Sequence, residues 1–272
     1  MSRVALQVAY DGTSFSGFQR QADCGGRTVQ GVLEEVLGRL CGRAPSSLGL
    51  KAAGRTDAGV HASAQVVAFD TDRSWDALRW RRALNALLPD DAAVLAVAFP
   101  PDDFDPRRMA VSRAYSYRLL VAETADPLRR HVTWHLPDVS DLGALDRAWT
   151  GLVGHHDFSA FCSTGSTPRS PLVTVQGTSV DVRGDEVVLR IQAASFLYHM
   201  VRRLVGAVRL VASGRGSVED YLALLDRDRK GLPPPVTAPA RGLCLDSVVY
   251  PQGLVSWDPP HLSLQGPIDA GT

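Results

Sequence analysis

Cysteine and long apolar runs are both scarce in this chain of 272 residues. The four cysteines form no Cys-x-x-Cys pair, which argues against a zinc site and a disulfide framework, so we expect free thiols. They are Cys24, Cys41, Cys162 and Cys244. No apolar run is long enough to cross a bilayer, and the first residues lack the apolar stretch of a secretory signal. The sequence therefore predicts a cytoplasmic protein.

The chain also has no net charge and very few lysines. Basic and acidic residues number 29 each, so the overall charge does not indicate a nucleic-acid partner. Lys51 and Lys230 are the only lysines, and a GC-rich genome would produce such an arginine bias without a functional cause. Two stretches nevertheless gather arginines: Arg107, Arg108, Arg113 and Arg118 in one, and Arg202, Arg203, Arg209 and Arg215 in the other. A neutral protein can still carry a local electropositive groove for phosphates.

What the chain does contain is a regular series of strand and helix patterns. In the first hundred residues the order is β-α-β-β-α-β, the split-βαβ or ferredoxin-like plan. The predicted strands are 3–10, 48–53, 63–70 and 92–99, and the predicted helices are 29–40, capped by Thr28, and 75–88.

The second half uses a similar order of elements. Its predicted strands are 113–121, 171–182, 186–194 and 243–250, and its predicted helices are 140–152, 195–212 and 218–227. We therefore expect an α+β fold of two ferredoxin-like halves with antiparallel sheets. The expected boundaries are 1–105 for the N-terminal half, 106–250 for the C-terminal half, and 251–272 for a loosely ordered tail.

One acidic residue, Asp57, has neighbours that suit a binding loop. It lies in the run GRTDAGVH at residues 54–61, just before the predicted strand 63–70. The flanking Gly54 and Gly59 let the backbone approach a ligand closely. Taken alone, an aspartate between glycines is also typical of an ordinary turn. The function of Asp57 therefore depends on the rest of the chain.

The run at 54–62 resembles the active-site motif of the tRNA pseudouridine synthase A family, the TruA family, and other segments match that family in the same order. They are YDGT (10–13), GFQRQ (17–21), TVQG (28–31), NALLP (85–89), RAYSY (113–117), GHHDF (154–158), FLYHMVR (196–202) and TAPARGL (237–243). The resemblance spans residues 4–250. It implies a pseudouridine synthase fold in which the two halves join around a central RNA-binding cleft.

The resemblance also implies a reaction. The family isomerises uridine to pseudouridine in the anticodon stem-loop of tRNA, at positions 38, 39 and 40, by breaking the N1–C1′ bond and re-forming it through C5. By position, Asp57 corresponds to the catalytic aspartate. A carboxylate suits this chemistry because detaching uracil leaves an electron-poor C1′, which a nucleophile can trap or an anion can stabilise. The resemblance implies no cofactor and no metal.

Three further residues are implied to bind the substrate. Arg202 corresponds to the arginine that pairs with the catalytic aspartate and keeps it ionised. Tyr115 corresponds to a tyrosine that stacks on the target uracil, and Arg55 to an arginine that contacts phosphate and holds the flipped uridine out of its stack. Without the resemblance, Tyr115 would be interpreted as core packing and both arginines as surface residues. A homodimer, with one tRNA contacting both subunits, is implied as well.

Some features depart from the family or favour another function. Phe18, Tyr198 and Arg203 stand where the family usually has Trp, His and Asn. One alternative is a catalytically inactive RNA-binding protein, since split-βαβ sheets bind RNA in other proteins. Another is a metal-dependent hydrolase using the histidines and aspartate of residues 155–157. We disfavour it because adjacent histidines on a loop cannot easily ligate one ion.

Overall fold

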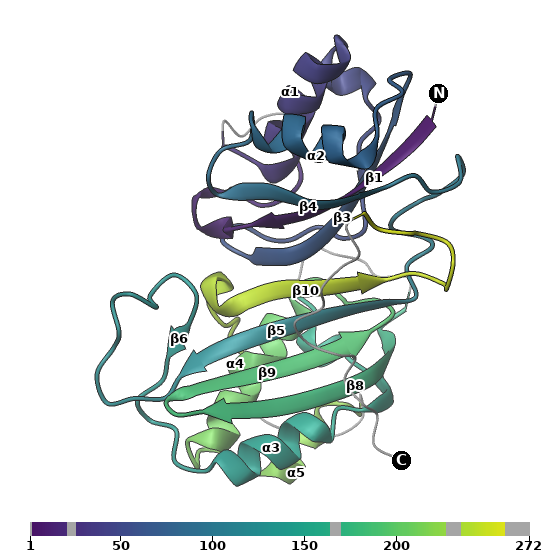
Figure 1. The fold of residues 1–272 in the computed structure, drawn as a ribbon. Helices are drawn as coiled ribbons and strands as arrows, with labels where there is room; N and C mark the ends of the chain where they lie inside the picture. Colours follow the sequence, from purple (N-terminus) through teal and green to yellow (C-terminus); the bar gives the residue numbers. More distant parts are fainter. Residues whose placement is uncertain (1, 21–25, 164–169, 227–234, 259–272) are drawn as a thin grey trace. The chain divides into compact units, whose positions relative to one another are not determined.

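The computed structural model describes residues 2–20, 26–163, 170–226 and 235–258. It combines helices with mostly antiparallel strands (Figure 1), so the predicted α+β class is confirmed. The chain divides into two compact units. The first unit consists of two segments, one that ends at Val111 and one that begins at Cys244. The second unit is Ser112–Leu243.

The first unit is a sheet with two helices on one side (Figure 1). In spatial order its strands are β4 (Ala92–Ala98), β1 (Ser2–Tyr10), β3 (His61–Thr71) and β10 (Leu243–Val249), with β2 (Lys51–Ala52) also on β3. β1 is antiparallel to both of its neighbours, whereas β10 runs parallel to β3. The helices are α1 (Val29–Cys41) and α2 (Ala77–Asn85).

The ends of α1 follow from its sequence. The predicted cap is confirmed, because the Thr28 side chain accepts a hydrogen bond from the Gly31 amide. The helix ends at Gly42, whose φ of 65° is in the left-handed region that favours glycine. Leu33 and Leu37 lie one turn apart and are both fully buried. Their burial holds α1 against the core of the first unit.

The second unit is also a sheet covered by helices. Its strands, in the order β5 (Ser112–Leu120), β9 (Glu186–Ala193), β8 (Leu172–Arg183) and β7 (Gly154–Asp157), are all antiparallel, and β6 (Trp134–His135) runs parallel to β5. The helices are α3 (Leu142–Thr150), α4 (Met200–Ala212) and α5 (Val218–Ala223). Trp149 of α3 is fully buried, and its indole N–H donates to the Arg190 carbonyl of β9 at 2.8 Å. This bond anchors α3 to the sheet.

The division of the chain differs from the predicted one in two places. The first unit extends to Val111, not to residue 105. The final strand, β10, returns to that unit and pairs with β3, although residues 106–250 were predicted to form one half. A strand that pairs with a distant segment leaves no local trace in the sequence, so the pattern at 243–250 predicted the strand but not its partner.

Two predicted elements are corrected in detail. The helix predicted at 195–212 begins only at Met200, because His199 has a left-handed backbone with a φ of 60°. Residues 154–157 form the short strand β7, so the neighbouring histidines lie on a strand and not on a loop. The two-residue strand β6 was not predicted.

The described part of the predicted tail has a defined contact. The backbones of Val97 and Asp258 exchange two hydrogen bonds, which adds Asp258 to the edge of β4. The rest of the tail, 259–272, lies outside the described residues. Among the helices of the described part, none has the length and apolar character of a membrane span.

The described cysteines are free thiols. Cys41, Cys162 and Cys244 form no disulfide, as expected from their spacing. Cys24 lies outside the described residues, so the expectation for it stays a prediction.

Candidate active site

Asp57 lies in the loop between β2 and β3, and the loop is anchored where it leaves β2. The Ala53 amide donates to the Val66 carbonyl at 2.8 Å. The Gln65 side chain, fully buried in β3, donates to the Gly54 carbonyl at 3.0 Å. A buried amide that has this partner is costly to displace. The first residues of the loop are therefore tied to β3.

The residue before Asp57 is bound from the N-terminal segment. The buried hydroxyls of Tyr10 and Thr56 share a hydrogen bond of 2.8 Å. The Thr56 carbonyl accepts a bond from the Phe18 amide at 3.0 Å. Thr56 therefore makes contacts through both its side chain and its backbone. The aspartate that follows starts from a fixed backbone position.

A tight turn then carries the chain from Asp57 into β3. The Val60 amide donates to the Asp57 carbonyl at 3.1 Å, and Gly59 within the turn has a φ of 78°. The Gly59 amide in turn donates to the Phe15 carbonyl at 3.3 Å. Asp57 itself is half-buried. Its carboxylate thus belongs to a loop that is held on both sides, as preorganised electrostatic sites require.

Two glycines of the N-terminal segment allow this close packing. A Cβ at Gly12 would lie 2.1 Å from the Val60 carbonyl oxygen, a distance that no real contact permits. Gly17 has a φ of 100°, and a Cβ there would lie 3.2 Å from the Thr56 carbonyl oxygen. Gly12 and Gly17, which come from the matched segments YDGT and GFQRQ, therefore pack directly against the Asp57 loop.

His61 completes the anchoring at the start of β3. Its buried ring accepts a hydrogen bond at Nδ1 from the Gly12 amide, at 3.0 Å, and an Asp11 oxygen lies 3.1 Å from the same nitrogen. Because Nδ1 accepts from a backbone N–H, the ring proton sits on Nε2. Arg55, on the same loop as Asp57, has an exposed side chain.

The other two predicted site residues belong to the second unit. Tyr115 lies on β5 opposite Ile191 of β9 and is half-buried. Its ring meets Phe196 edge-on, with centroids 5.1 Å apart. Tyr115 is therefore only partly packed, whereas Tyr117, two residues along the same strand, is fully buried.

Arg202 lies in the first turn of α4 and is bound to the segment that carries the TAPARGL motif. Its Nε donates to the Ala238 carbonyl at 2.8 Å, while the Ala238 amide donates to the Arg202 carbonyl at 3.0 Å. Gly206, one turn further along α4, is buried, and a Cβ there would strike the Val236 carbonyl oxygen. This close approach of residues 236–238 fixes the orientation of Arg202.

The positive charge of Arg202 affects the pKa of the buried Tyr117 hydroxyl. Burial raises the pKa of the Tyr117 hydroxyl well above its usual value, although the positive charges of Arg202 and Arg241 lower it in part. Tyr117 is thus neutral at physiological pH, and its hydroxyl donates to the Pro239 carbonyl at 2.7 Å. Arg202 and Tyr117 together hold both ends of the 238–239 backbone.

The backbone before α4 is strained. Among the described residues, His199 is the one non-glycine residue with a positive φ. Its ring stacks on Tyr198 at 3.8 Å, and its Nδ1 shares a hydrogen bond of 3.0 Å with the Ser163 hydroxyl. Such a conformation costs about 1–2 kcal/mol and persists only where contacts enforce it. It lies one turn before Arg202.

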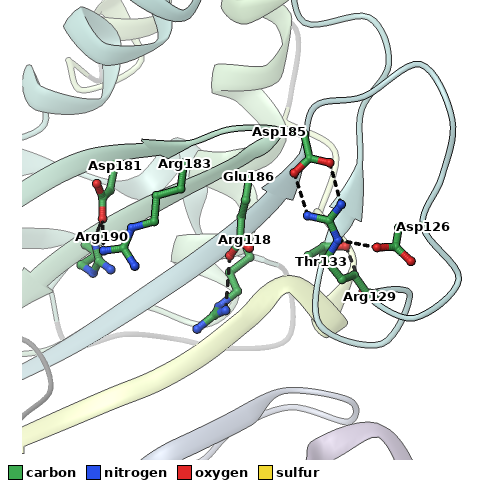
Figure 2. Close-up of polar contacts among 9 residues, drawn as sticks. All are labelled: Arg118, Asp126, Arg129, Thr133, Asp181, Arg183, Asp185, Glu186 and Arg190. Atoms are coloured by element: carbon green, nitrogen blue, oxygen red, sulfur yellow. Dashed lines mark hydrogen bonds and ion pairs between the residues drawn. The ribbon is translucent and has the colours of Figure 1, made fainter.

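The two arginine stretches do not form one uncompensated groove. Arg113 is buried and donates to the Ala194 carbonyl, and Arg118 pairs with Glu186 at 3.3 Å (Figure 2). Arg209 and Arg215 share the carboxylate of Asp138. Much of this clustered charge is therefore used within the fold, and an RNA contact has to be argued from single residues.

The histidines of residues 155–157 make ordinary strand contacts. His155 Nδ1 lies 2.9 Å from the Thr174 hydroxyl, and His156 Nε2 donates to the Val153 carbonyl at 3.1 Å. In the part of the chain that the structure describes, no group of three or more histidines, cysteines or acidic residues is arranged to hold a metal ion.

Each unit contains two of the four predicted site residues. The sequence did not reveal all the residues that support them. Asp57 and Arg55 share one loop of the first unit, whereas Tyr115 lies on β5 and Arg202 on α4 of the second. The predicted pairing of Arg202 with Asp57 joins residues of different units and stays a prediction. Gln65 supports the site but gave no signal, because its segment shows only a strand pattern, and Ala238 belongs to a matched motif that did not reveal its contact with Arg202.

Comparisons with known proteins agree with this arrangement of motifs. The family model described as tRNA pseudouridine synthase matches residues 6–107 and 148–251. The tRNA pseudouridine synthase A of Methylobacterium nodulans is 45% identical over 258 residues, which cover 94% of this chain and 99% of the relative. That of Paramagnetospirillum magneticum is 43% identical, covering 92% and 96%, and that of Halalkalibacterium halodurans is 41% identical, covering 89% and 90%.

The family-model match includes the Asp57 loop and α4, and the alignment with the Methylobacterium nodulans relative covers most of both units. The chain belongs to the tRNA pseudouridine synthase family.

Proposed function

We propose that this tRNA pseudouridine synthase modifies uridines 38, 39 and 40 of the anticodon stem-loop, with Asp57 as the catalytic carboxylate. The observation that carries the proposal is the fixed loop around Asp57, in which Thr56 and Gly59 are both hydrogen-bonded to the N-terminal segment. A half-buried carboxylate on such a loop needs little reorganisation to meet a developing charge.

The isomerisation requires one bond to break and another to form. Uracil leaves C1′ through N1, turns over, and is rejoined to C1′ through C5, after which the C5 proton is lost and N1 carries a proton. The product has the atoms of the substrate, so no oxidant or reductant takes part. In this proposal Asp57 acts on the electron-poor C1′ while the base is detached.

The remaining roles are assigned to three residues. Tyr115 stacks on the target base, for which its half-buried ring beside Phe196 is suited. Arg202, held by Ala238, supplies a fixed positive charge for the carboxylate, and the exposed Arg55 contacts a phosphate of the flipped nucleotide. We further propose that the protein works as a cytoplasmic homodimer. Its mass in solution, measured by light scattering, tests the dimer.

The reaction is tested with an unmodified transcript of a tRNA that carries uridine at positions 38–40. We expect the intact protein to form pseudouridine there, mapped by chemical labelling. We expect Asp57→Asn to lower the rate by roughly a thousandfold or more while tRNA binding largely persists, because the amide keeps the shape and removes the charge. Arg202→Ala should also lose turnover severely.

Asp103→Asn is the matched control, since it makes the same chemical change at an exposed position of the same unit. It should keep full activity. Normal turnover by Asp57→Asn would remove the assignment of the catalytic residue. Tight tRNA binding without any product from the intact protein would favour the inactive RNA-binding protein instead.

A further inference from the structure

A cavity of about 500 Å³ lies within the second unit, at the end of β5 and beside β6. Its lining includes Arg130, His131, Trp134, His135 and Arg241. None of the proposed site residues Asp57, Arg55, Tyr115 or Arg202 lines it. The volume is within the range of cavities that hold small ligands, and a single nucleotide is of that size. The cavity is thus separate from the residues assigned to the reaction.

The loop that forms most of this cavity is held in place by ion pairs. Arg129 donates to both oxygens of Asp185 at 2.8 and 2.6 Å, and to Asp126 at 2.7 Å (Figure 2). The Thr133 hydroxyl donates to the Arg129 carbonyl at 2.9 Å, and the Val121 amide to the Asp185 carbonyl at 2.7 Å. Residues 121–133 are therefore fastened to the β8–β9 turn, and the cavity is formed before any ligand arrives.

The charge of the lining is positive. Asp126 is its one acidic residue, and the adjacent guanidinium of Arg129 neutralises it. Arg130 and Arg241 are both exposed and bonded to neutral carbonyls, through Nη1 to Pro127 at 2.8 Å and through Nε to Thr133 at 3.1 Å. These bonds orient the two side chains. Two oriented guanidinium groups suit a phosphate.

The same cavity offers an aromatic surface. Trp134 is half-buried, and its ring is fixed by the edge of Tyr117 at 6.3 Å and by the Arg209 guanidinium at 5.4 Å. A fixed aromatic ring in a cavity that arginines also line is a combination with which proteins bind single-stranded nucleotides, because the ring stacks on a base while the cations contact its phosphate.

We infer that this cavity binds a nucleotide of the tRNA other than the uridine that is isomerised. Its phosphate contacts Arg130 and Arg241, and its base packs against Trp134. The inference rests on tRNA being the substrate, as in the proposed function. It adds an anchoring contact that raises affinity for tRNA without touching the reacting atoms.

The test measures tRNA binding and turnover separately. In Arg130→Ala combined with Arg241→Ala, we expect the Kd for an unmodified tRNA to rise by roughly tenfold, and KM with it, while kcat stays within about twofold. The slope of log Kd against log salt should fall by about 1 for each phosphate that the variant no longer neutralises. Trp134→Leu should weaken binding without changing that slope. Replacing Arg130 by lysine in place of alanine should restore most of the affinity for tRNA, because lysine keeps the positive charge.

Arg183→Ala is the matched control. Arg183 is an exposed arginine of the same unit that pairs with Asp181 at 2.7 Å and does not line the cavity. It should bind tRNA as the intact protein does. An unchanged Kd and salt slope in the double variant would overturn the inference, as would an effect confined to kcat. Because binding is also measured with Asp57→Asn as the background, the outcome does not depend on the proposed catalytic role.

Discussion

At the scale of single residues, the position of Asp57 depends on groups that are not themselves reactive. The Tyr10–Thr56 hydroxyl pair and the Gln65 amide are buried and bonded, so displacing either would leave an unsatisfied polar group. Gly12 has a different role, because its missing side chain makes room for the Val60 carbonyl. A change at Gly12 should therefore act on catalysis through the loop.

We predict that Gly12→Ala lowers both stability and turnover. The new Cβ would lie 2.1 Å from the Val60 carbonyl oxygen, so the backbone after Asp57 must shift. Such overpacking costs about 1–3 kcal/mol, and a displacement of about 1 Å at a catalytic group lowers a rate by roughly a hundredfold. Denaturant unfolding and kcat per folded molecule measure the two effects.

Gly184→Ala is the control, because it also replaces a glycine by alanine but creates no close contact. Gly184 has a φ of 62° in open space, so alanine there costs only backbone strain, about 1–2 kcal/mol, and activity should be retained. Full turnover by Gly12→Ala would show that the loop is not positioned through this contact.

The site residues themselves could be named from the sequence only through matched motifs. Asp57 has the neighbours of a turn, and Tyr115 alternates with Tyr117 as any strand pair does. The structure gives Tyr115 and Tyr117 different burial, which a period-two pattern cannot distinguish. Local patterns therefore place these residues on elements, whereas their chemistry is implied by the set of motifs that accompanies them.

At the scale of elements, regular periodicity predicted the long strands and helices, and tertiary contacts decided the rest. β6 and β7 have two and four residues, too few to show a period. The apolar spacing of α4 continues back to Leu197, but the left-handed backbone of His199 makes the helix begin at Met200. The loop 121–133 also has no pattern, and its order comes from the ion pairs of Arg129.

We predict that these ion pairs stabilise the second unit at neutral pH and not in acid. Hydrogen bonds from Arg129 hold the pKa of Asp126 and of Asp185 below the usual range. A carboxyl whose pKa is lowered by folding contributes stability above its ordinary pKa, and that contribution is lost as the pH falls through the lowered value. Arg129→Leu should therefore lower the free energy of unfolding at pH 7, and the difference from the intact protein should shrink progressively as the pH falls below about 4.

Arg130→Leu is the neighbouring control for this measurement. Arg130 bonds to the neutral carbonyl of Pro127 and to no carboxylate that the structure shows, so any effect of its replacement should not follow the protonation of an aspartate. A difference between Arg129→Leu and the intact protein that is the same at pH 3 and pH 7 would contradict the assigned ion pairs.

At the scale of the whole molecule, the first unit is built from segments that are far apart in the sequence. β10 begins where the second unit ends, at Leu243, but pairs with β3, with Cys244 opposite His61 and Leu245 opposite Ala62. The Ser63 hydroxyl donates to carbonyls of the same strand. The strand that begins directly after the Asp57 loop is thus supported from the far end of the chain, a pairing between segments too distant for local sequence patterns to predict.

We predict that the first unit is not stable as the N-terminal fragment 1–111. Without β10 it loses the burial of Leu245 and Val248, which are 0% and 8% exposed. Each such side chain contributes about 1.5–3 kcal/mol, a large part of the 5–15 kcal/mol that stabilises a typical domain. Joining 1–111 to 244–258 should restore the stability, because it returns β10 to β3.

The joined chain needs a linker that spans β10. Seven residues of strand extend about 23 Å, which a Gly/Ser linker of about twelve residues covers. The comparison is the denaturant midpoint of 1–111 with and without the added strand, and the same joined chain with Leu245→Asp serves as the control. That control should behave like 1–111, because a carboxylate cannot be buried there without a partner. Equal midpoints for 1–111 and the joined chain would mean that β10 adds nothing to the first unit, and that the support of β3 comes from the N-terminal segment alone.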